Sequence, residues 1–180
     1  MEFLITVSIG MIVSVVAVPS VVVGVANIRL RSSMTSLAGV IQNCRMLAVK
    51  QNRAMITHFS TQPHGIMAYV KRASDPAQLA TSDSQVQLEA PVSQSTSPSG
   101  IGAPAELDST TLGFTPQTGD PSFNPTGLPC AYLSGNCPNS GFIYYFHDTR
   151  SMGQSGWAAL SISPAGRLKK WFWDGSNWTD

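Results

Sequence analysis

The feature that most constrains this 180-residue chain is an uncharged run of 26 residues, from 3 to 28, directly after the acidic Glu2. A helix of about 20 apolar residues is long enough to cross a bilayer. The run is too long for the apolar core of a signal peptide, which has about 7–15 residues, and no basic region or small-residue cleavage site accompanies it. We therefore expect residues 1–28 to form a transmembrane helix that stays with the protein.

The helical pattern continues beyond the uncharged run. Apolar residues recur there at alternating spacings of four and three: Leu30, Met34, Leu37, Ile41, Cys44 and Ala48. This periodicity predicts an apolar stripe on a helix whose opposite face is polar. We expect one helix over residues 2–52, on the order of 75 Å long, with residues 29–53 as its amphipathic half. Pro19 lacks a backbone N–H, so it should kink or locally melt this helix.

The remaining residues, 54–180, have the alternating pattern of β-strands. Strands are expected at 54–60, 65–72, 86–89, 141–147, 157–163 and 167–173, with turns at 61–64 and 164–166. Residues 91–127 are rich in Pro, Gly, Ser and Thr, which predicts a long irregular surface loop. The chain is therefore predicted to be α+β, with a long N-terminal helix packed on a C-terminal antiparallel β-sheet head.

Charge is unevenly divided between these parts. Residues 1–53 carry a net charge of +4 and residues 54–180 a net charge of −3. An acidic head argues against broad electrostatic binding of DNA. Arg167, Lys169 and Lys170 are interleaved with aromatic residues, however, and such a pattern can hold phosphates and stack bases. The alternative is a strand in which the lysines stay solvated and the apolar side chains pack inward, namely those of Leu168, Phe172 and Trp173.

The sequence around Glu2 and Pro19 is similar to a known family. Glu2 followed by Phe3-Leu4-Ile5, and the later step Ala17-Val18-Pro19-Ser20, resemble the N-terminal helix of type IV pilins and of the pseudopilins of type II secretion. Three further segments resemble the GspH/FimT group of pseudopilins: 37–53, 122–129 with Gly127, and 162–168 with Gly166. In this family a short basic leader ending in Gly precedes the mature helix; neither stands before Glu2 here, so both an upstream leader and an unprocessed chain stay open.

The resemblance implies a structural subunit that initiates or tips a filament. Glu2 would attract the N-terminal amine of a neighbouring subunit during assembly; the alternative is that Glu2 merely lies in the lipid headgroup layer. The implied partners are other pilin or pseudopilin subunits, the inner-membrane assembly platform, the prepilin peptidase and, before assembly, membrane lipid. The implied location is the bacterial inner membrane with the head in the periplasm, followed by incorporation into a pilus or pseudopilus.

Two other functions remain open at this stage. One is a DNA-binding minor pilin of natural transformation, and the other is a single-pass membrane-anchored β domain of unrelated function. An enzyme is not expected, because the sequence has no H-E-x-x-H, G-x-S-x-G or P-loop motif. His58, His64 and His147 have no metal-ligand spacing and are expected at the surface, so no metal or cofactor is predicted.

The three cysteines fall into two classes. Cys130 and Cys137 bracket a short loop with a Gly turn, and in the oxidising compartment of an exported head they are expected to form a disulfide. A metal site is the alternative, but the C-x-x-C spacing is missing. Cys44 lies on the apolar helix stripe and is expected to be a buried small hydrophobic residue.

Overall fold

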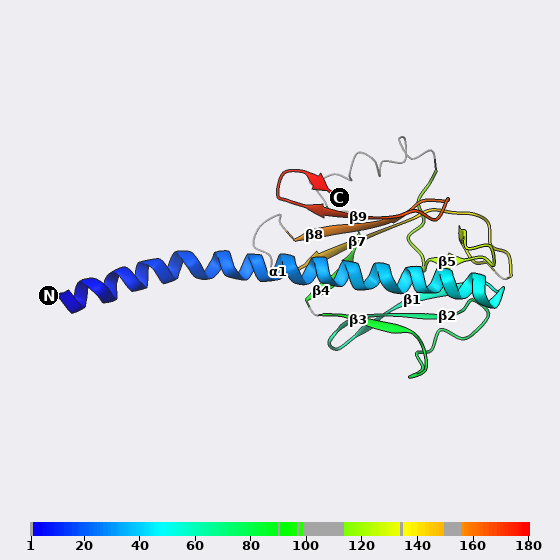
Figure 1. Ribbon diagram of the computed structural model, residues 1–180, viewed down its shortest axis with the longest axis horizontal. Helices are drawn as coiled ribbons and strands as arrows, with labels where there is room; N and C mark the ends of the chain where they lie inside the picture. The colour runs from blue at the N-terminus through cyan, green and yellow to red at the C-terminus, as the bar shows by residue number, and fades with distance from the viewer. Residues whose placement is uncertain (1, 90, 97, 99–113, 134, 150–155) are drawn as a thin grey trace.

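The computed structural model describes residues 2–89, 91–96, 98, 114–133, 135–149 and 156–180. The side chains of residues 2–6, 8–10, 12–20 and 89 are outside this description. Within these residues one helix, α1 (Glu2–Gln51), precedes ten strands. Figure 1 shows that the N-terminal part of α1 extends away from the head, whereas its C-terminal part lies across it. The predicted long helix and the α+β class are confirmed.

Two predictions concern the N-terminal part of α1: the effect of Pro19 and the transmembrane span. The helix is continuous through Pro19, so the predicted local melting is wrong. Figure 1 shows the N-terminal part of α1 curving gently. A proline removes a single backbone donor, and the neighbouring hydrogen bonds can keep the helix intact. Within the described residues, no helix is long and apolar enough to cross a membrane. The transmembrane span predicted for residues 1–28 is therefore not confirmed.

The head contains two antiparallel sheets where the sequence suggested one. The first has the order β3-β2-β1-β5-β6 and the second the order β10-β9-β8-β7-β4. The strands of the first sheet are β1 (Met55–Gln62), β2 (Gly65–Arg72), β3 (Gln85–Glu89), β5 (Ser122–Phe123) and β6 (Pro129–Cys130). Those of the second are β4 (Val92–Ser95), β7 (Phe142–Asp148), β8 (Trp157–Ile162), β9 (Leu168–Trp173) and β10 (Trp178–Thr179). Figure 1 shows the two sheets diverging on either side of α1.

The predicted irregular loop at 91–127 is wrong at both ends. Its first residues form β4, because Val92 is buried in the core and the strand pairs with β7. Its last residues include β5, where Ser122 and Phe123 are buried and pair with β1 and β6. Residues 99–113 lie outside the described part of the chain. Burial against distant strands therefore overrides the loop composition at these ends.

The core lies between α1 and the two sheets. All six residues of the predicted helix stripe are at most 2% exposed. They pack with large side chains from both sheets, including Phe123, Tyr144, Phe146 and Leu160. Full burial of a Leu or Phe side chain is worth about 1.5–3 kcal/mol, so this shared core holds the head against the helix.

Candidate functional site

The N-terminal part of α1 carries apolar side chains that nothing in the described chain covers. Among the described side chains of α1, the first buried ones are Ala26 and Leu30, where the head starts. Before and around this point large apolar side chains are exposed: Val7, Met11, Val21, Val22, Val25 and Ile28. Val21 is 64% exposed and Ile28 is 69% exposed. Exposed apolar side chains that gather on one element are typical of an interaction surface.

The predicted assembly residue lies at the start of this helix. Glu2 is the first residue of α1, so its backbone lies at the end of the helix farthest from the head (Figure 1). The side chain is outside the described set, so its role remains a prediction. A carboxylate near a helix N-terminus is favoured by the helix dipole.

The three segments that resemble pseudopilins converge on Arg45 of α1. Arg45 Nη1 donates a hydrogen bond to the carbonyl oxygen of Gly166, with a distance of 3.1 Å. A Cβ atom added at Gly166 would lie 3.2 Å from Arg45 Cζ, and one added at Gly127 would lie 2.9 Å from Val49 Cγ2 and 3.4 Å from Arg45 Nε. Both glycines have left-handed backbones, with φ values of +79° and +81°. The Arg45 side chain therefore contacts two turns that need glycine.

The Gly127 turn is itself held by Asn124. The side-chain oxygen Oδ1 of Asn124 accepts hydrogen bonds from the backbone N–H groups of Thr126 (3.0 Å) and Leu128 (2.9 Å) and from the Thr126 hydroxyl (2.7 Å). Gly127 N–H donates to the Asn124 carbonyl at 2.8 Å. An Asn side chain that bonds its own following backbone stabilises such turns. These segments thus join the head to the helix, which is a structural role.

Lys169 and Lys170, two of the cations near the C-terminus, make different contacts. Lys169 Nζ lies 3.0 Å from Asp180 Oδ2 and 3.8 Å from the centre of the Trp171 ring. Lys170 Nζ donates to Thr35 Oγ1 of α1 at 3.3 Å, so the two lysines point to opposite faces of β9. Arg167 is exposed in the preceding turn. The hydrogen bond and charge of Lys169 lower the pKa of Asp180.

The inward packing predicted for β9 is correct for two residues and wrong for one. Leu168 and Phe172 pack against the main core. Trp173 lies on the other face, where its ring contacts that of Trp178 with 5.6 Å between centroids. Side chains alternate between the two faces of a strand, so neighbouring residues 172 and 173 cannot both face the core.

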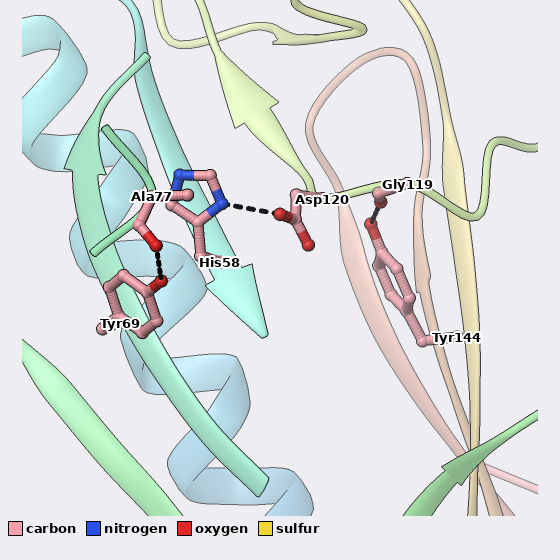
Figure 2. A network of polar contacts seen from close by, with 6 residues as sticks. All are labelled: His58, Tyr69, Ala77, Gly119, Asp120 and Tyr144. Carbon is pink, nitrogen blue, oxygen red and sulfur yellow. Dashed lines mark hydrogen bonds and ion pairs between the residues drawn. The ribbon is translucent and has the colours of Figure 1, made fainter. Parts of the chain in front are cut away.

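Gly119 and Asp120 belong to a segment that crosses between the two sheets, and tyrosine and histidine side chains bind it (Figure 2). His58 Nδ1 lies 2.6 Å from Asp120 Oδ2, and the Tyr144 hydroxyl donates to the carbonyl of Gly119. Burial, and to a smaller extent the Asp120 charge, raise the pKa of Tyr144 well above its usual value. The His58 side chain is only 14% exposed, which corrects its predicted surface position. His58 is opposite Tyr69 in the sheet.

The cysteines are arranged as predicted. Cys130 and Cys137 form a disulfide, and Cys44 is fully buried on α1. Burial raises the pKa of the Cys44 thiol to about 12. Among the described residues, no group of three or more His, Cys, Asp or Glu side chains is placed to hold a metal ion.

Comparison with known proteins finds a distant structural likeness. No protein-family model and no curated protein matches the chain. A solved structure, the type IV minor pilin FimU of Pseudomonas aeruginosa strain PAO1, is similar with a TM-score of 0.49 and 16% sequence identity. The alignment covers 84% of this chain and 92% of that one. A likeness at this level carries no argument about function.

Proposed function

We propose that this chain is a minor pilin or pseudopilin, a non-enzymatic structural subunit of a type IV pilus or a type II secretion pseudopilus. It joins the filament through the N-terminal half of α1 and displays the β head on the outside. The observation that carries this proposal is the division of α1. One half is buried in the head, and the other extends from it with exposed apolar side chains.

The chemistry of the extended half favours packing against other helices. Residues 3–28 contain no charged side chain, so this surface is stable only where water is excluded. A helix satisfies its backbone hydrogen bonds internally, and parallel helices can bury their apolar faces against one another. Related helices from neighbouring subunits supply such a surface along a filament. The head then determines which subunits lie next to it.

Glu2 has a specific role in this proposal. A carboxylate in an apolar filament core needs a cationic partner or must take up a proton. The N-terminal amine of a neighbouring subunit is the cation that a helical array of such chains supplies at that depth. Glu2 would therefore select the axial position at which a new subunit joins.

A DNA-binding function has less support. Lys169 pairs with Asp180 and Lys170 bonds to α1, so these two cations do not form a shared surface for phosphates. A gel-shift experiment at low salt tests the point directly. No shift by the full chain is the expected result.

The proposal is tested first at Glu2. The Glu2→Ala variant should be made at the normal level and be absent from sheared filaments, because the carboxylate partner of the amine is lost. Glu2→Asp keeps the charge and should retain partial incorporation. Asp75→Ala, which removes an exposed loop carboxylate, is the matched control and should assemble normally. Normal assembly of Glu2→Ala would contradict the proposed role.

A second test concerns the exposed face of α1. Ile28 and Met46 are similarly exposed, at 69% and 63%. Ile28 is at the end of the extended half of α1, whereas Met46 is on the outer side of the half that packs on the head. Ile28→Lys should greatly reduce incorporation into filaments, because it places a charge in the apolar packing surface. Met46→Lys should have a much smaller effect. Equal effects of the two substitutions would argue against packing through the extended half.

A further inference from the structure

A cleft of about 720 Å³ opens between the two sheets of the head. It is lined by residues of β1, β2, β4 and β7 and by Thr96 and Thr118. Phe59 and Tyr144, whose ring centroids are 5.3 Å apart, contribute aromatic surface, and Ser93, Ser95 and Thr61 contribute hydroxyl groups. None of the lining residues in the described part of the chain is charged.

In the described part of the chain, one wall of the cleft is a strand edge without a paired strand, and this edge belongs to β1. Pairing of β1 with β5 is limited to Met55 and Ile56, and the N–H of Thr57 then donates to the Pro121 carbonyl at 2.9 Å. Alternate residues of a strand direct their backbone groups to the same edge. Phe59 and Thr61 therefore direct theirs to this edge, and no strand in the described part of the chain pairs with them there.

The chain leaves this edge because it crosses to the other sheet. The segment that crosses is residues 117–121. At its N-terminal end it reaches β7, where Gln117 N–H donates to the Gly141 carbonyl at 2.8 Å and Ile143 N–H donates to the Gln117 carbonyl at 3.1 Å. The contacts of Asp120 with His58 and of Gly119 with Tyr144 fasten it on both sides (Figure 2). The crossing thus ends the pairing of β1 and leaves its last residues facing the cleft.

We propose that this cleft binds an extended, uncharged segment of a partner protein, which adds as a strand to the open edge at Phe59 and Thr61. Proteins usually protect an open edge with charged side chains or proline, and the described residues that line the cleft include neither. Added strands gain affinity from backbone hydrogen bonds and specificity from alternate side chains. Here one set of side chains would contact the aromatic surface and the other the hydroxyl groups. The uncharged lining disfavours a charged segment, because a buried charge without a partner is costly.

The test uses the full-length protein and a defined probe, an acetylated and amidated hexapeptide of alternating valine and serine. A peptide of the same length that alternates lysine and serine is the control. Binding of the neutral peptide should slow hydrogen exchange at the amides of Phe59 and Thr61, and the charged peptide should have no effect. The inference does not depend on the proposed filament function.

Two variants distinguish pairing at the strand edge from nonspecific binding of the peptide. Thr61→Pro removes an N–H that makes no bond to β2 and should weaken binding about tenfold, since proline is tolerated at an edge but cannot donate. Thr61→Ala keeps the N–H and should bind within about twofold of the natural protein. Should Thr61→Pro fail to fold, Thr118→Lys places a charge in the cleft and should also prevent binding. Absence of protection at Phe59 in the natural protein, or unchanged binding by both variants, would overturn the inference.

Discussion

The contact of Arg45 with the Gly166 turn leads to a quantitative prediction. Gly166 and Gly175 both have left-handed backbones, with φ values of +81° and +105°. A Cβ atom at Gly166 would lie 3.2–3.3 Å from the Arg45 guanidinium group, whereas one at Gly175 would have no heavy atom within 4 Å. The Gly175→Ala variant is therefore a matched control that has the same kind of backbone strain without the contact.

The expected magnitude is the sum of two terms. An alanine in the left-handed region costs about 1–2 kcal/mol, and this term applies to both variants. At position 166 the guanidinium must also move by a few tenths of an ångström, which disturbs its 3.1 Å hydrogen bond to the Gly166 carbonyl. A charged hydrogen bond is worth about 1.5–3 kcal/mol when buried and less at this half-exposed site. Gly166→Ala should therefore cost about 1 kcal/mol more than Gly175→Ala.

Urea unfolding of the full chain in a mild detergent measures these differences. Tryptophan fluorescence reports on the head, because all four tryptophans lie between residues 157 and 178. In an Arg45→Ala background the extra cost of Gly166→Ala should fall below about 0.5 kcal/mol, since the two changes act on one contact. An equal cost for the two glycine variants, or an extra cost that persists without Arg45, would refute this reasoning.

Two further predictions concern the disulfide and the response to pH. Replacing Cys130 and Cys137 together by alanine should lower the free energy of unfolding by about 2–3 kcal/mol, the loop-closure value for a short disulfide loop; equal unfolding midpoints with and without the bond would contradict it. Burial, opposed in part by the charge of Asp148, lowers the pKa of His147. The unfolded chain therefore binds the extra proton more readily, so stability should fall as the pH decreases below about 6.5 towards the lowered folded-state value. His147→Gln should show a weaker dependence in urea unfolding between pH 7 and pH 5, and an unchanged dependence would count against this assignment.

Local patterns in the sequence were sufficient for the helix and for most of the strands. The spacing of Leu30, Leu37 and Ile41 predicts the buried stripe of α1, because the helical period alone decides which side chains share a face. The alternation in residues 141–147 and 157–163 likewise predicts β7 and β8. The disulfide followed from two cysteines close in sequence and an expected oxidising location.

The candidate site was only partly predictable. The uncharged run and Glu2 identify the extended half of α1, since the absence of charge is visible in the sequence. The open edge at Phe59 and Thr61 could not be inferred, because it depends on where the segment near Asp120 leaves β1. Trp173 was misplaced because the prediction assigned it to the same face as its neighbour Phe172, although adjacent residues of a strand point to opposite faces.

By itself the sequence determined the helix and the longer strands, the apolar stripe and the need of residues 3–28 for a surface that excludes water. Only the tertiary structure decided that the strands form two sheets, that β4 and β5 arise in a loop-like segment, and that Arg45 contacts Gly166. The hydrogen bond of Arg45 to Gly166 joins residues 121 positions apart, and the pair of His58 and Asp120 is 62 positions apart. Periodicity reflects the geometry of a few consecutive residues, whereas such contacts exist only when packing of the whole chain offsets the entropy of bringing distant segments together.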